Sequence, residues 1–119
     1  MKGSLRKRQA LNENLFKELG GDLTRARTND LNRWSKQNGR EHEICKVVTA
    51  MDLIREDHIV LLEAEMTYQG TRRVADILDF YPEIPRVYEI QHSETELSIE
   101  HKRKFWVDKV GFDYTVIKV

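Results

Sequence analysis

The sequence predicts a single-domain α/β fold, and two observations carry that prediction. Apolar residues have a helical spacing up to about residue 56 and alternate as in strands over 58–91. A second helical spacing follows at 95–110, and a last alternating segment at 113–119. The predicted order is helix, strand, strand, strand, helix, strand, behind an N-terminal helical extension. A chain of 119 residues, 39% hydrophobic and 34% charged, has the size and composition of one globular domain.

The first 39 residues are predicted to be a basic helical extension to the main domain at 40–119. Within this extension, residues 5–19 predict a helix that Gly20 and Gly21 bring to an end. Its apolar side chains lie near one helical stripe: Leu5, Leu11, Leu15, Phe16 and Leu19. Because Leu11, Leu15, Leu19 and Trp34 are too many apolar side chains to leave in water, we expect residues 1–39 to form a dimer or nucleic-acid contact surface.

The clearest helical pattern of the chain lies at 40–56, after a polar segment at 22–39. The polar segment predicts a loop with a short helix capped by Thr28 or Asn29. In the helix at 40–56, one stripe is apolar and is expected to face the core: Ile44, Val47, Val48, Met51 and Ile54.

Four alternating segments predict the strands, and one more helix separates the last two. The predicted elements are strands at 58–66, 72–80, 86–91 and 113–119 and a helix at 95–110. The first two strands form a hairpin because Gln69-Gly70 supplies a turn. Strict alternation in the first strand places Glu63 and Glu65 on one face and Leu62, Ala64 and Met66 on the other.

Composition excludes several classes of protein. No apolar run approaches the roughly 20 residues that span a bilayer, and no continuous apolar stretch follows the basic start as in a secretory signal. Cys45 is the only cysteine, which excludes a disulfide framework and a multi-cysteine zinc site. We therefore expect a cytoplasmic protein with no membrane partner.

The formal net charge of zero conceals a strong asymmetry along the chain. Residues 1–40 carry ten Lys and Arg against four Asp and Glu, whereas residues 41–119 carry ten against sixteen. A basic front segment favours a polyanion such as nucleic acid, because binding releases condensed counterions. The alternative is that the two halves attract each other or a second subunit.

Acidic residues inside apolar strand segments are the most informative feature. Asp76 lies between Ala75 and Ile77, and Glu89 lies between Tyr88 and Ile90. A carboxylate in such a position faces solvent, is paired or binds a cation, because an unpaired buried charge is very costly. With Glu65 and Gln91, the two acids are spread over three consecutive predicted strands. Carboxylate and amide oxygens are hard ligands that suit Mg²⁺ or Mn²⁺.

These residues resemble the PD-(D/E)XK nuclease superfamily. The resemblance rests on Glu65, RRVAD ending at Asp76, and YEIQ with Glu89 and Gln91, and it covers about 40–119. It implies a restriction-endonuclease-like core, with a mixed central sheet flanked by helices in the order αβββαβ. Within the superfamily, EIQHSE and the preceding GREHEICK are most similar to competence-associated nucleases. The core and length are also similar to those of small Holliday-junction resolvases.

The resemblance implies a metal-dependent site. Asp76, Glu89 and the Ile90 carbonyl would hold Mg²⁺ or Mn²⁺, Gln91 would position a water, and Glu65 or Glu43 would supply a further acid. Gln91 stands where the family more often has lysine, so a neutral hydrogen bond replaces a positive charge at that position. The residue before Asp76 also departs from the family pattern, because it is alanine rather than proline.

The implied function is a metal-dependent DNA endonuclease, with branched or single-stranded DNA as the expected substrate class. Phosphates would be held by basic residues without reading sequence: Arg72, Arg73, Lys46, Arg25 and Arg27. His42 is interpreted as a surface or capping residue, with a phosphate or metal contact beside Lys46 as the alternative. We expect a homodimer, and the compact size suggests a viral or mobile-element protein. The alternative function is a catalytically inactive nuclease-fold protein that binds nucleic acid or scaffolds a replication or recombination complex.

Overall fold

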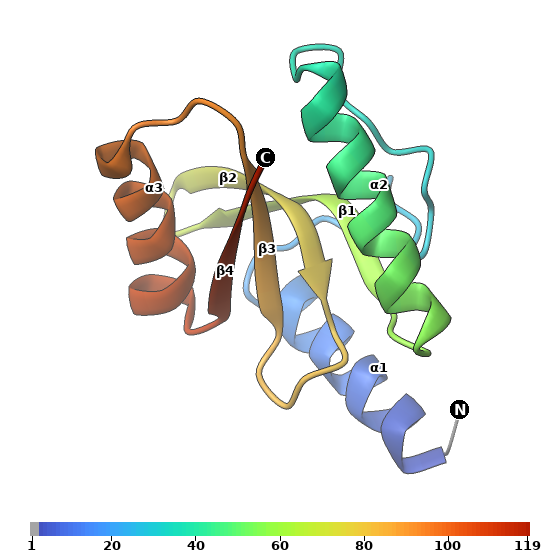
Figure 1. Ribbon diagram of the computed structural model, residues 1–119. Coiled ribbons are helices and arrows are strands. Elements are labelled where there is room, and N and C mark those ends of the chain that lie inside the picture. Colours follow the sequence, from blue (N-terminus) through green and yellow to red (C-terminus); the bar gives the residue numbers. More distant parts are fainter. Residues whose placement is uncertain (1–2) are drawn as a thin grey trace.

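The computed structural model describes residues 3–119 and confirms the α/β class (Figure 1). The elements are α1 (Gly3–Glu18), α2 (Arg40–Arg55), β1 (Val60–Tyr68), β2 (Thr71–Asp79), β3 (Arg86–Gln91), α3 (Glu96–Arg103), the wider π-helical segment η1 (Lys104–Val110) and β4 (Asp113–Lys118). The four strands form one mixed sheet in the order β1-β2-β3-β4, in which β3 and β4 are parallel and the other neighbours antiparallel. Among residues 3–119, no helix is long and apolar enough to cross a membrane.

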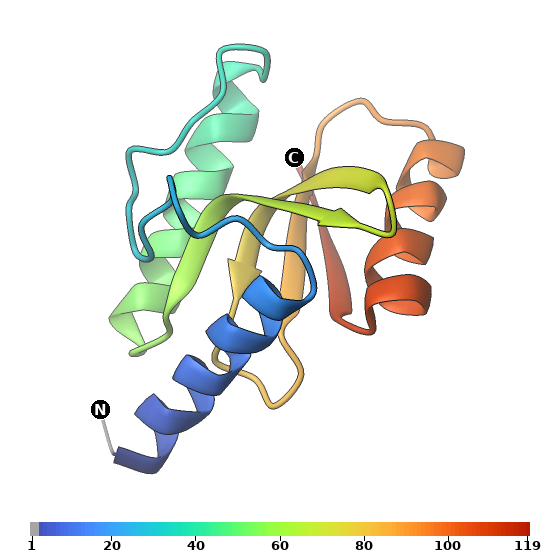
Figure 2. The ribbon, with the colours of Figure 1, turned by 180° about the vertical axis from the view of Figure 1, so that it is seen from behind.

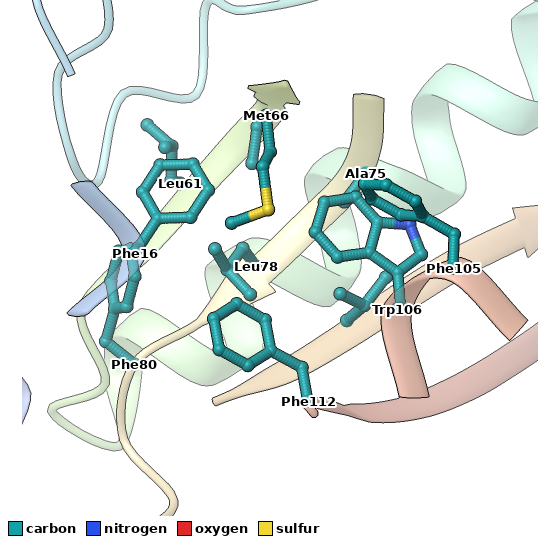
Figure 3. Packing of buried hydrophobic residues seen from close by; sticks show 11 residues of the cluster. Phe16, Leu61, Met66, Ala75, Leu78, Phe80, Phe105, Trp106 and Phe112 are labelled. Atoms are coloured by element: carbon teal, nitrogen blue, oxygen red, sulfur yellow. The ribbon is translucent and has the colours of Figure 1, made fainter. Parts of the chain in front are cut away.

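Helices cover both faces of the sheet (Figures 1 and 2). On one face, Phe16 of α1 and the aromatic pair Phe105 and Trp106 of η1 belong to the main core cluster (Figure 3). The rings of that pair meet edge to face, with centroids 4.9 Å apart. On the other face, Ala50 of α2 packs in a smaller cluster with Ile77 of β2. Residues from the N-terminal segment therefore share the main core with the body of the protein.

Gly20 and Gly21 end α1 as expected, and they also bring the chain against β1. Gly20 has a φ of 111°, and a Cβ at this position would lie 2.0 Å from the Thr67 carbonyl oxygen. The Thr67 N–H donates to the Gly20 carbonyl at 3.1 Å, and Gly21 forms an isolated bridge with Met66. A side chain at Gly20 would therefore separate the chain from β1.

The buried face of α1 differs from the predicted stripe. Leu11 and Leu15 are 67% and 39% exposed, whereas Asn12 and Phe16 are buried. The Asn12 amide donates to the Phe80 carbonyl at 2.9 Å, just beyond the end of β2. A polar side chain occupies the buried face because it satisfies a backbone carbonyl that no strand partner reaches.

The predicted short helix within 22–39 is absent from the structure. Asn29 has a φ of 56° and pairs with the start of β1 instead of capping a helix. Its side-chain oxygen accepts from the Val60 N–H at 2.8 Å, and its own N–H donates to the Val60 carbonyl at 2.8 Å. Pairing with the edge strand thus replaces the expected helical turn.

The predicted apolar stripe of α2 is also largely on the outside. Ile44 and Val48 are each 50% exposed, whereas His42 and Lys46 face inward and are buried. The physical reason is the composition of the sheet beneath the N-terminal half of α2. There the sheet presents Glu63 and other carboxylates, so basic side chains turn toward it.

The alternation of β1 breaks at Glu63, contrary to the predicted two-sided pattern. Glu63 has a φ of 50°, and as a result Leu61 and Ala64, three residues apart, join the same core cluster, whereas Leu62 joins the cluster under α2. Arg33 stabilises this irregular backbone by donating to the Leu62 carbonyl at 2.7 Å and to the Glu63 carbonyl at 3.1 Å. Glu63 is thereby directed toward α2.

Candidate active site

Asp76 and Glu89 lie side by side at the point where β2 and β3 separate. The antiparallel pairing of these strands ends at Ile77 and Tyr88, and in the same register the next pair is Asp76 and Glu89. The Asp76 carboxylate accepts a hydrogen bond from the Ile90 backbone N–H at 2.8 Å. The carboxylate therefore occupies the place of a backbone partner, and both acids are buried, with exposures of 8% and 5%.

The electrostatics of this carboxylate pair favour an additional positive charge. Burial raises the pKa of Glu89 well above its ordinary value, and the charge of Asp76 and a hydrogen bond with Asp76 raise it further. The Oε1 atom of Glu89 is buried and has no hydrogen-bond partner among residues 3–119. A proton or a cation between the two carboxylates relieves this repulsion.

The pair opens onto a pocket of about 610 Å³. The segment 34–38 forms one wall, and residues of α2, the first three strands, the turn before α3 and α3 itself form the rest. The lining residues are Trp34, Ser35, Lys36, Gln37, Asn38, His42, Glu63, Arg72, Val74, Asp76, Glu89, Glu94 and Lys102. Asp76 and Glu89 therefore open into the same cavity.

Lys102 of α3 is a pocket residue that the sequence analysis did not single out. Its ammonium group binds the Glu94 carboxylate at 2.7 Å. Burial alone lowers the pKa of Lys102, but the hydrogen bond to Glu94 and the nearby charge of Glu89 outweigh burial and raise the pKa above its ordinary value. In the sequence, Lys102 is one of several basic residues in HKRK, so only its helical position relative to β3 distinguishes it.

Gln91 has the predicted strand position but does not line the pocket. Its amide nitrogen donates to the Glu94 carbonyl at 3.0 Å, which fastens the turn between β3 and α3. The Oε1 atom of Gln91 is buried without a hydrogen-bond partner in the described chain. Lys102, on the helix that this turn positions, supplies a cation to the pocket instead.

A polar network from α2 supports the carboxylate pair. His42 contacts Asp76 through Nε2 at 3.3 Å and Glu43 through Nδ1 at 3.1 Å. Lys46 is fully buried and pairs with Glu43 at 2.9 Å and with Glu63 at 2.9 Å. His42 is therefore an interior residue rather than a surface one. Lys46 neutralises two carboxylates and has no exposed surface to offer a phosphate.

Glu43 also holds the wall of the pocket in place. Its Oε1 atom accepts from the Ser35 N–H at 2.5 Å. Burial acts to raise the pKa of Glu43, but the hydrogen bonds from Ser35, Lys46 and His42 bring it below its ordinary value. An ionised Glu43 thus ties the segment 34–38 to α2, and it reaches Asp76 only through His42.

The other predicted acid, Glu65, lies outside the pocket lining. It forms an ion pair with Arg72 at 2.7 Å on the surface, and this hydrogen bond lowers the pKa of Glu65. Glu63, two residues earlier, lines the pocket instead. The left-handed backbone at Glu63 turns this side chain toward α2, and strict alternation could not have indicated that.

The predicted phosphate-binding residues are not all gathered at the site. Arg72 lines the edge of the pocket, whereas the Arg73 guanidinium lies 5.9 Å from the centre of the Phe105 ring. Arg25 and Arg27 are exposed and do not line the pocket. The basic contribution to the pocket itself comes from Lys36, Arg72 and Lys102.

The oxygen atoms at the pocket supply only part of the coordination shell of a divalent cation. Within residues 3–119, no group of three or more His, Cys, Asp or Glu side chains is placed to hold a metal ion. Two adjacent carboxylates still suit Mg²⁺, which retains several waters and is usually bound through one or two carboxylates plus substrate phosphates. The unpartnered oxygen of Glu89 fits that role.

No family model, curated protein or solved structure matches the chain.

Proposed function

We propose that this protein is a metal-dependent nuclease that hydrolyses phosphodiester bonds in DNA at the Asp76–Glu89 pocket. The observation that carries the proposal is the pair of adjacent, buried carboxylates open to a cavity with basic residues on its walls. A carboxylate pair of this kind repels a phosphate unless a cation lies between them. In a protein that only binds nucleic acid, such repulsion at the binding surface would weaken binding of the phosphate backbone.

The proposed roles follow from the contacts of each side chain. Asp76 and Glu89 hold Mg²⁺ or Mn²⁺, and the Ile90 backbone orients the Asp76 carboxylate through its N–H. When bound, the metal ion lowers the pKa of a water and polarises the phosphate. Lys102 stabilises negative charge on the phosphate, and His42 holds the Asp76 carboxylate from the side of α2.

The exposed side chains that line the pocket support nucleic acid as the substrate class. Lys36 and Arg72 are exposed at the pocket and supply phosphate contacts without base specificity. Trp34 is 60% exposed at the same pocket and offers a face on which an unpaired base can stack. These features favour a substrate with single-stranded character, such as a fork, a flap or a branch point.

A cleavage assay tests the proposal. Labelled linear, nicked, forked, four-way and single-stranded DNA, with matched RNA, are incubated with Mg²⁺, Mn²⁺ or EDTA. We expect cleavage only with metal, its loss in Asp76→Asn and Glu89→Gln, and its retention in Glu65→Gln, whose carboxylate is exposed outside the pocket. Cleavage that survives Asp76→Asn would overturn the proposed site. Binding without cleavage of any substrate would instead favour the inactive nucleic-acid-binding alternative.

A further inference from the structure

The outer face of α2 carries an apolar stripe that nothing within residues 3–119 covers. Ile44, Val48 and Met51 are 50%, 50% and 41% exposed, and their spacing of four and three residues places them on one side of the helix. An adjoining groove of about 350 Å³, lined mainly by apolar side chains, includes Trp34. This apolar surface is continuous along two turns of α2.

The two ends of this stripe carry opposite charges. Glu41 precedes Val48 by seven residues and Arg55 follows it by seven, so all three lie on the same side of the helix. Glu41 and Arg55 are exposed, and neither forms an ion pair within the described part of the chain. The stripe thus runs from an acid, through apolar residues, to a base.

We infer that this stripe is a homodimer interface, at which α2 packs antiparallel against α2 of a second copy of the chain. A two-fold axis near Val48 places Ile44 and Met51 against the same apolar stripe of the partner. The same axis sets Glu41 opposite the partner's Arg55, and the reciprocal pair forms at the other end. A parallel arrangement would set Glu41 opposite the partner's Glu41, so the charge pattern selects the antiparallel one.

The stripe on α2 is complementary to itself, which is why we infer that a second copy of the chain covers it. One surface supplies both members of each charge pair and both halves of the apolar contact, as an isologous interface requires. The groove beside the stripe and the Asp76–Glu89 pocket share Trp34. The interface therefore adjoins the wall of the pocket, but its existence does not depend on the proposed nuclease activity.

Sedimentation equilibrium of the full chain and two single variants tests the apolar part of the interface. We expect a dimer for the parent and a monomer for Val48→Asp. The matched control is Leu97→Asp on α3, which replaces an equally apolar side chain that is 66% exposed, and this variant should remain dimeric. Circular dichroism checks that both variants fold. A parent that stays monomeric at all accessible concentrations, or a dimer that survives Val48→Asp, would overturn the inference.

A charge-reversal series tests the orientation. Glu41→Arg and Arg55→Glu each turn two attractions into repulsions and should weaken dimerisation about tenfold. The double variant should recover the parent affinity, because both pairs are then restored with exchanged signs. Mixing the two single variants should give a heterodimer tighter than either homodimer. Additive weakening in the double variant would exclude antiparallel pairing of these helices.

Discussion

The Asp76 carboxylate takes the Ile90 backbone N–H as its hydrogen-bond donor, at 2.8 Å, just where the pairing of β2 and β3 ends. This contact fixes the Asp76 side chain at the point where β2 and β3 separate. It also places the carboxylate beside Glu89, the residue before Ile90. The geometry of the candidate active site is therefore a consequence of how the sheet opens.

The two substitutions Asp76→Ala and Asp76→Asn should differ in stability although both abolish cleavage. Alanine leaves the buried Ile90 N–H without an acceptor, which should cost about 1–3 kcal/mol in the free energy of unfolding. Asparagine keeps an acceptor oxygen and removes the repulsion with Glu89, so this variant should be at least as stable as the parent. Urea denaturation of both variants measures the difference, and equal losses would contradict this role of the contact.

Divalent metal should bind weakly to the free protein and more tightly with DNA present. The Asp76–Glu89 pair supplies only part of a coordination shell, and phosphate oxygens complete it. Calorimetric titration with Mn²⁺, with and without a non-cleavable oligonucleotide, measures both affinities. Binding should be lost in Asp76→Asn and retained in Glu65→Gln. Equal affinity in Asp76→Asn and the parent would place the metal elsewhere.

Glu89 should make the free energy of unfolding fall with rising pH in the absence of metal. The pKa of Glu89 is raised in the folded state above its unfolded value of about 4.3. Between these two pKa values, the native state therefore binds more protons than the unfolded state. Stability therefore decreases as pH rises through this window. Glu89→Gln cannot ionise and should be more stable at neutral pH by roughly 1 kcal/mol. Urea titrations from pH 5 to about pH 8 check this, and parallel curves for the two proteins would refute it.

Lys46 should be essential for folding stability rather than for contact with the substrate. Lys46→Met removes the cation between Glu43 and Glu63 and leaves two mostly buried carboxylates facing each other, at a cost of about 3 kcal/mol. Arg72→Met removes an exposed ion pair and should leave stability unchanged within error. Thermal and urea unfolding of the two variants separate these cases. Equal losses of stability in Lys46→Met and Arg72→Met would mean that the burial of Lys46 does not contribute to the free energy of unfolding.

Lys102 should act on the rate of cleavage without affecting the fold. Lys102→Gln removes positive charge from the pocket and should lower the single-turnover rate about 10²-fold, whereas Lys102→Arg should recover part of it. Lys104→Gln, at the start of η1 directly after α3 and outside the pocket, is the control. Unchanged rates for Lys102→Gln at saturating DNA would remove Lys102 from the chemistry.

The order of helices and strands could be predicted from the sequence because it depends on local spacing. The helix at 40–56 and the strands at 58–66, 72–80, 86–91 and 113–119 correspond closely to α2 and β1–β4. The placement of Asp76 and Glu89 on adjacent strands also followed from this order. Their juxtaposition also depends on the register of the antiparallel pair, which sets Asp76 opposite Glu89 just beyond the last paired residues, Ile77 and Tyr88.

Beyond Asp76 and Glu89, tertiary structure alone decided which side chains face the site. The apolar stripe of α2 predicted that Ile44 and Val48 would be buried, yet the helix turns Lys46 inward because the sheet below it carries Glu63. Likewise, nothing in the local pattern of β1 indicates a left-handed residue at Glu63, which depends on Arg33 binding the adjacent carbonyls. Local sequence determined secondary structure through the periodicity of apolar residues. The pairing of buried charges between elements far apart in the chain decided how those elements are rotated, because an unpaired buried charge costs more than an exposed apolar side chain.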